Sequence, residues 1–227
     1  LGDEATIVLA GTELTLSEDT RIDGGGNRIT IDADGNGGVF RVAGEGTEAT
    51  IDGLTLRGAD RAAVLVEEGA VLRAADTLIT DNTATAGRAA AIANYGDLYA
   101  ENITVSGNHM SDDGCGRSSA LYNAGSAQLA QSTFADNHAV LEVRFDEDAG
   151  ASRDDVFQFE NEESIEDCAA ALINRGAIEI SNSIITNNDA AIWAGYFYKN
   201  PVIFPDFYTF RGEANLGGDA PSHVGNV

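Results

Sequence analysis

One pattern recurs along the chain and restricts the fold more than any other feature. It consists of a glycine or a small residue, a run of alternating apolar residues, and a closing asparagine. Five copies can be aligned, beginning at Thr47, Ala70, Gly96, Gly125 and Gly176. A fixed internal pattern of this length indicates a repeat architecture, in which each copy buries its apolar side only against its neighbours. The wide gap before the last copy places an insertion there.

The apolar residues within a copy predict short strands. In the copy that starts at Gly96 they are Leu98, Ala100, Ile103 and Val105. A spacing of two is typical of a strand whose alternate side chains face inward, and the jump of three between the pairs indicates a corner. A third short strand precedes the glycine. Three short strands per copy predict one coil of a parallel β-helix, an all-β solenoid of about seven to eight coils with strands spaced about 4.8 Å apart.

Two columns of asparagine support this interpretation. One column lies two residues before the glycine and the other closes each copy. Asparagine tolerates the left-handed backbone of a corner, and stacked amides can exchange hydrogen bonds from coil to coil. The alternative is a set of ordinary turn residues that do not touch. Both interpretations make these residues structural: Asn94, Asn123 and Asn174 in one column, and Asn82, Asn108, Asn137 and Asn188 in the other.

The repeat divides one domain, residues 1–227, into segments. Residues 1–46 are expected to form irregular first coils, and residues 47–139 and 168–192 regular ones. Residues 140–167 are the inserted loop, and residues 193–227 form an aromatic C-terminal cap.

The charge of the chain excludes some partners. Asp and Glu number 37 against 13 Lys and Arg, which gives a formal net charge of −24. Such a surface repels phosphate backbones, so we expect no nucleic-acid partner. No apolar run is long enough for a transmembrane helix. The excess of acid suits a solvated surface in salt water or the binding of calcium.

The repeat resembles that of a known group. Ser118-Ser119-Ala120-Leu121 and Phe134-Ala135-Asp136-Asn137 are similar to the GGA[ILV] and FxxN motifs of bacterial polymorphic outer-membrane proteins, with serines in place of the two glycines. The resemblance covers roughly residues 5–190 and implies a right-handed parallel β-helix of a secreted or cell-surface protein. Relatives of this kind are mostly adhesins, whereas the same fold also houses pectate lyases and polygalacturonases. Fold therefore leaves function open.

The insertion and the two cysteines break the repeat. The insertion is acidic, and its Asp146 and Asp148, with Asp112 and Asp113 near the first cysteine, are weak candidates for calcium ligands; the alternative is a solvated flap lying over the side of the rod. Cys115 and Cys168 fall near the same corner of consecutive coils. One strand spacing is within reach of a disulfide, so we predict one there, with two free thiols as the alternative.

The C-terminal segment is the most aromatic part of the chain. It is expected to cap the last coil, because an open end exposes core and unpaired backbone. The alternative is a surface that binds sugar rings or another subunit, formed by Trp193, Tyr196, Tyr198, Phe207 and Tyr208. Self-association through this end would produce fibres.

Catalytic candidates are few. His109 and His138 follow the closing asparagine in consecutive coils, and with Arg144 they make the best lyase-like or metal-binding cluster. Two histidines at a corner are more often surface residues. The function we expect is a non-catalytic, adhesin-like or structural module that binds polysaccharide, cell-surface glycans or calcium. The alternatives are a lyase acting on acidic polysaccharide and a self-assembling fibre subunit.

Overall fold

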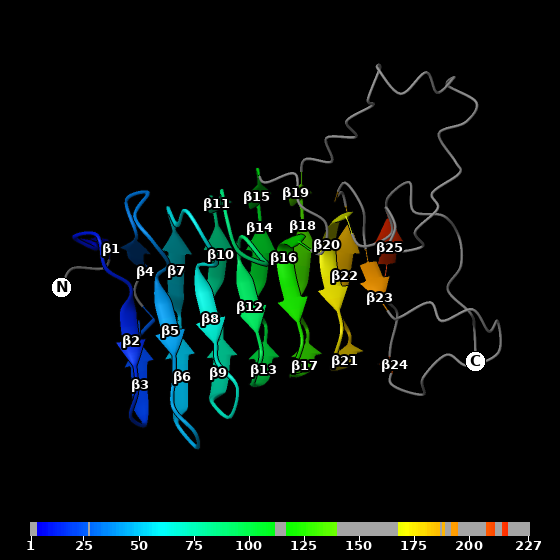
Figure 1. The fold of residues 1–227 in the computed structure, drawn as a ribbon, viewed down its shortest axis with the longest axis horizontal. Coiled ribbons are helices and arrows are strands. Elements are labelled where there is room, and N and C mark those ends of the chain that lie inside the picture. Colours follow the sequence, from blue (N-terminus) through cyan, green and yellow to red (C-terminus); the bar gives the residue numbers. More distant parts are fainter. Residues whose placement is uncertain are drawn as a thin grey trace, which may run out of the picture.

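Over the residues that the structure describes, the protein is a parallel β-helix with three long sheets and one short one. The computed structural model describes residues 4–26, 28–111, 117–139, 168–186, 188, 192–194, 208–211 and 215–217. Every strand pair in the described residues is parallel. Each coil contributes one strand to each of three long sheets in turn, which we call B, C and A, as can be followed along the rod in Figure 1. The predicted fold class is confirmed.

Sheet A contains eight strands: β1 (Glu4–Val8), β4 (Arg28–Asp32), β7 (Leu54–Arg57), β10 (Leu78–Thr80), β14 (Thr104–Ser106), β18 (Thr133–Ala135), β22 (Ile184–Thr186) and β25 (Asn215–Gly217). Sheet B contains seven: β2 (Leu14–Leu16), β5 (Phe40–Val42), β8 (Val64–Val66), β12 (Ile92–Asn94), β16 (Arg117–Asn123), β20 (Cys168–Asn174) and β23 (Ile192–Ala194).

Sheet C also contains seven strands: β3 (Thr20–Asp23), β6 (Glu48–Asp52), β9 (Val71–Ala75), β13 (Asp97–Glu101), β17 (Ser126–Ala130), β21 (Ala177–Ser181) and β24 (Tyr208–Arg211). The short sheet D holds β11 (Thr83–Ala84), β15 (His109–Met110) and β19 (His138–Ala139). The first strands, β1 to β5, pair in register with the later coils.

The core is built from columns of equivalent residues. Leu98 pairs in register with Leu72 and Ala127, and all three side chains are buried. Val105 stacks between Ile79 and Phe134 in the same way. Because strand side chains alternate between faces, the residues between these columns point outward.

Amide ladders run through this core. Asn82, Asn108 and Asn137 each donate from Nδ2 to Oδ1 of the next residue in the column, over 2.8, 2.9 and 3.0 Å, and the column ends at Asn188. In the second column Asn94 and Asn123 donate to the next asparagine over 2.6 Å each, ending at Asn174. All seven are buried, so the amides satisfy one another where water is excluded, except that Oδ1 of Asn94, the first of its column, has no donor in the described residues.

A steric contact explains why glycine recurs at one position of the repeat. A Cβ atom on Gly96, Gly125 or Gly176 would overlap the carbonyl oxygen of the equivalent residue in the preceding coil. That carbonyl is held in place because it accepts the next backbone N–H, as Gly96 does from Ser126 over 2.9 Å. Only glycine allows the coils to approach this closely.

Candidate functional site

The predicted histidine pair lies on sheet D. His109 of β15 and His138 of β19 are partners in register, so the two residues are stacked in consecutive coils as their offsets predicted. His109 is half-buried and His138 is exposed. The inward positions of the same sheet belong to a small apolar cluster of Ala84, Ala90 and Met110. Arg144, the third member of the predicted cluster, lies outside the described residues.

The other predicted sites are largely outside the described residues. This applies to Asp112, Asp113, Asp146 and Asp148, to Cys115, and to Tyr196, Tyr198 and Phe207. The backbone of Cys168 pairs with that of Arg117, two residues beyond Cys115. The disulfide therefore stays a prediction. No group of three or more metal-ligating side chains occurs in the described part of the chain.

An unpredicted cluster of aromatic and basic side chains lies on the outer face of sheet B. Tyr122 occupies an outward position near the end of β16, and its ring lies 5.8 Å from that of Tyr95, tilted by 49°. The guanidinium group of Arg88 lies 5.8 Å from the centre of the Tyr122 ring. Tilted aromatic pairs and cation–π contacts at these distances are attractive. We call Arg88, Tyr95, Tyr122, Ala124 and Arg175 the Tyr95 cluster.

Backbone hydrogen bonds fix the cluster to the solenoid. The carbonyl oxygen of Arg88 accepts from the N–H of Ser118 over 2.9 Å, which fastens the loop before β12 to the start of β16. The N–H of Tyr95 donates to the carbonyl of Val66 over 2.8 Å. The side chains therefore project from a rigid surface, which favours a preformed binding site.

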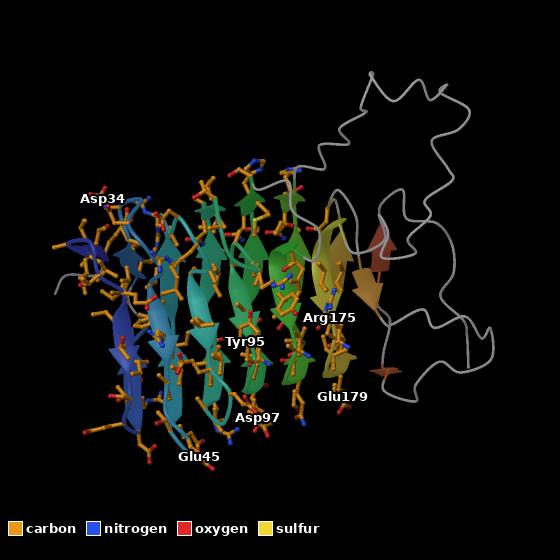
Figure 2. All side chains as sticks on the ribbon, viewed as in Figure 1. Asp34, Glu45, Tyr95, Asp97, Arg175 and Glu179 are labelled. Carbon is orange, nitrogen blue, oxygen red and sulfur yellow. The ribbon has the colours of Figure 1, made fainter. Side chains whose placement is uncertain are left out.

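The turn between sheets B and C adds the rest of the cluster. Tyr95, Ala124 and Arg175 follow the buried column Asn94, Asn123 and Asn174, so they occupy one position in successive coils. All three are exposed, and Figure 2 labels Tyr95 and Arg175 on this side of the rod. The small Ala124 lies between Tyr95 and Arg175, whose backbones are two strand spacings apart along the axis, about 9–10 Å.

Tyr122 supports the exposed members. Only 6% of Tyr122 is accessible, whereas 37% of Tyr95 is. Burial raises the pKa of Tyr95, the neighbouring Tyr122 raises it further, and the positive charge of Arg88 acts in the opposite direction. Tyr95 is thus a neutral ring with a hydroxyl group at physiological pH, able to stack and to hydrogen-bond.

The outward column of sheet B extends beyond the cluster. Leu65, Ala93, Tyr122 and Ile173 are partners in register, and β23 places Trp193 next in the same column. Trp193 was predicted as part of a ligand surface, and its backbone position joins it to this column. Tyr208 lies instead on β24 of sheet C. The structure thus assigns these two predicted aromatic residues to different sheets.

Sequence reasoning missed the Tyr95 cluster because it followed the inward positions. A signal was present: Tyr122 lies between Leu121 and Asn123, which are both inward residues of the repeat. A residue between two inward positions of a strand must face outward.

Comparison with known proteins agrees with the architecture. Residues 37–203 match the family described as a right handed beta helix region. The chain belongs to this right-handed β-helix family. No curated protein and no solved structure matches it. The resemblance to polymorphic outer-membrane protein repeats stays a prediction within the right-handed β-helix family. No helix that could span a membrane occurs in the described residues.

Proposed function

We propose that this right-handed β-helix is a non-catalytic module of a secreted or cell-surface protein that binds carbohydrate at the Tyr95 cluster. The observation that supports the proposal is the exposed Tyr95 ring, which is held against Tyr122 and followed by the small Ala124 and by Arg175. An aromatic ring covers the apolar face of a sugar, and the flanking guanidinium and phenol groups hydrogen-bond its hydroxyls.

The rigid position of the cluster favours binding over catalysis. A ring held against Tyr122 by the solenoid loses little conformational entropy when a ligand docks. Neither Tyr95 nor Arg88 is suited to remove a proton at neutral pH, because the pKa of Tyr95 is raised and arginine stays protonated. The cluster can hold and orient a sugar ring.

A binding screen with a matched control tests this function. Soluble oligosaccharides and polysaccharides are titrated against the wild-type chain, Tyr95→Ala and Tyr99→Ala, with binding followed by calorimetry. Tyr99 is the matched control because it lies on sheet C under the guanidinium group of Arg73, 4.5 Å from its ring centre. We expect at least a tenfold loss for Tyr95→Ala and none for Tyr99→Ala. Equal losses, or no binding by the wild type, would contradict the proposal.

A polysaccharide lyase is the second candidate, favoured by the stacking of His109 and His138. Two adjacent imidazoles are one source of the base that a β-elimination needs. A rise in unsaturated-uronate absorbance on pectin or alginate that disappears in the double variant His109→Gln, His138→Gln would replace the non-catalytic proposal. Calcium is included in the assay because the acidic insertion was expected to bind it.

Self-assembly is the third candidate. Ile7 and Leu14 occupy core positions, yet 42% and 39% of them are exposed, because they belong to the first described coil. Unpaired strand edges with exposed core residues template further strands. Light scattering over a range of concentrations tests it, and a constant monomer mass would rule it out.

A further inference from the structure

Asparagine side chains in this right-handed β-helix fall into distinct structural classes. Most of those in the repeat are buried in the two ladders, where Nδ2 is already bonded to the next coil. A second class lies at the corner between sheets C and A. Asn102 and Asn182 occupy this corner with φ values of 54° and 49°, and both are exposed.

Asn102 is the only asparagine of the sequence that begins an Asn-x-Thr or Asn-x-Ser motif. Its neighbours are Ile103 and Thr104, whereas Asn182 is followed by Ser183 and Ile184. The intervening Ile103 side chain is buried in the core. Asn102 and Thr104 flank Ile103 on either side. Asn102 is exposed and Thr104 is half-buried, so both residues of the motif lie on the outside of the corner.

We propose that Asn102 is a site of N-linked glycosylation. The proposal rests on the extracellular placement inferred above, since this motif is an acceptor in secreted proteins. The donor is a sugar activated by a phosphate or pyrophosphate carrier. Nδ2 forms a bond to C1 of the sugar while the C1–O bond breaks; the carrier phosphate leaves with the electron pair of that bond, and the proton lost from Nδ2 passes to solvent.

The local contacts of Asn102 permit the product. Nδ2 donates to Oδ1 of Asp76 over 2.6 Å, and both residues are exposed. Glycosylation replaces one of the two Nδ2 hydrogens, so the other retains the bond to Asp76. The backbone N–H of Asn102 stays bonded to the carbonyl of Ala130 over 3.0 Å, which leaves the corner unchanged.

The hydroxyl group of Thr104 is also available to a transferase. It makes no hydrogen bond within the described part of the chain, whereas the buried Thr77 in the neighbouring coil bonds the carbonyl of Ala75 over 2.7 Å. The strand β13 separates Asn102 from Tyr95, so a glycan here leaves the Tyr95 cluster open.

The experiment exports the chain from cells that carry out N-linked glycosylation and measures the intact mass and the modified peptide. The wild type is expected to carry one glycan at Asn102, Thr104→Ser to retain it, and Asn102→Gln and Thr104→Val to lose it completely. Ile184→Thr completes the same motif at Asn182 and is the matched control. Circular dichroism establishes that each variant is folded.

Two outcomes would overturn the inference. One is a bare Asn102 in a chain that gains a glycan at Asn182 after Ile184→Thr. The other is a wild-type chain without glycan from cells that modify an unrelated acceptor. The carbohydrate-binding screen uses protein from a host without this modification, so either proposal can fail alone.

Discussion

The ladder residue Asn108 offers the sharpest test of what holds the coils together. Its Oδ1 accepts from Nδ2 and N–H of Asn82 over 2.8 and 3.3 Å. Its Nδ2 donates to Oδ1 of Asn137 over 2.9 Å and to the carbonyl of Ile79 over 3.0 Å. Asn108 is completely buried, so no water replaces these bonds after truncation.

The substitution Asn108→Ala leaves one group without a partner. Nδ2 of Asn82 retains the carbonyls of Leu56 and Thr80, and Oδ1 of Asn137 retains the backbone N–H of residue 108. The buried N–H of Asn82 loses its acceptor. An orphaned buried donor costs about 1–3 kcal/mol, and each lost hydrogen bond about 1 kcal/mol net. We therefore expect a loss of roughly 3–5 kcal/mol in the free energy of unfolding.

Urea unfolding followed by circular dichroism measures this loss. Asn102→Gly is the matched control, because it keeps the left-handed corner and removes one exposed bond. It is expected to cost less than about 1 kcal/mol. A loss for Asn108→Ala that does not exceed that of the control would refute the reasoning that the ladder stabilises the stack.

Three further predictions address the turns, the cluster and the charge. Gly125→Ala is expected to cost about 3 kcal/mol in the free energy of unfolding, because its Cβ would meet the backbone of Tyr95 and Gly96. Gly46→Ala has open space around its Cβ and costs only the strain of its positive φ. Unfolding midpoints that rank the two variants in reverse would contradict the packing. The pKa of Tyr95 is expected to lie above that of an ordinary tyrosine, so its contribution to stability is complete below pH 10 and is lost as the pH rises through its folded pKa. Because Arg88 lowers that pKa, Arg88→Gln should raise it further. An ultraviolet titration that shows the pKa lowered would contradict the assigned role of Arg88. Sodium chloride is expected to raise the melting temperature, because it screens the self-repulsion of a chain with a net charge of −24. It also weakens partly exposed ion pairs such as Arg57–Asp32, but each of these is worth only about 0–1 kcal/mol. A melting temperature that falls with salt would reverse this ranking.

The inward half of the structure could be predicted from the sequence. Leu98, Ala100, Ile103 and Val105 were expected inside and are all buried. This succeeds because stacking forces every coil to place an apolar or amide side chain at the same inward position. The corner residues follow the same logic, since Asn102 and Asn182 share the left-handed backbone that the turn demands.

The outward half could not be predicted in the same way. Tyr95 and Tyr122 meet because Tyr95 is in the turn after β12 and Tyr122 is on β16 of the next coil, and no repeat requires aromatic residues at either position. His109 and His138 were found because they share one offset from a ladder asparagine. Residues in one column can be aligned from sequence, whereas contacts between different columns need the geometry of the coil.

This difference indicates where the function of a right-handed β-helix is to be sought. Inward columns are restricted by packing, so Leu121, Asn123 and their equivalents serve the fold. Outward columns are less restricted by packing, although Ala93, Tyr122 and Ile173 on sheet B form a second buried apolar cluster. Along sheet B the outward residues change from Arg41, paired with Glu67, to Tyr122 within three coils. An ion pair stabilises neighbouring coils by itself, whereas the Tyr95 ring, tilted against Tyr122, keeps 37% of its residue exposed to a ligand. Substitutions of the exposed Tyr95 and Arg175 should therefore affect binding before they affect stability, whereas Tyr122 is buried and serves the packing as well.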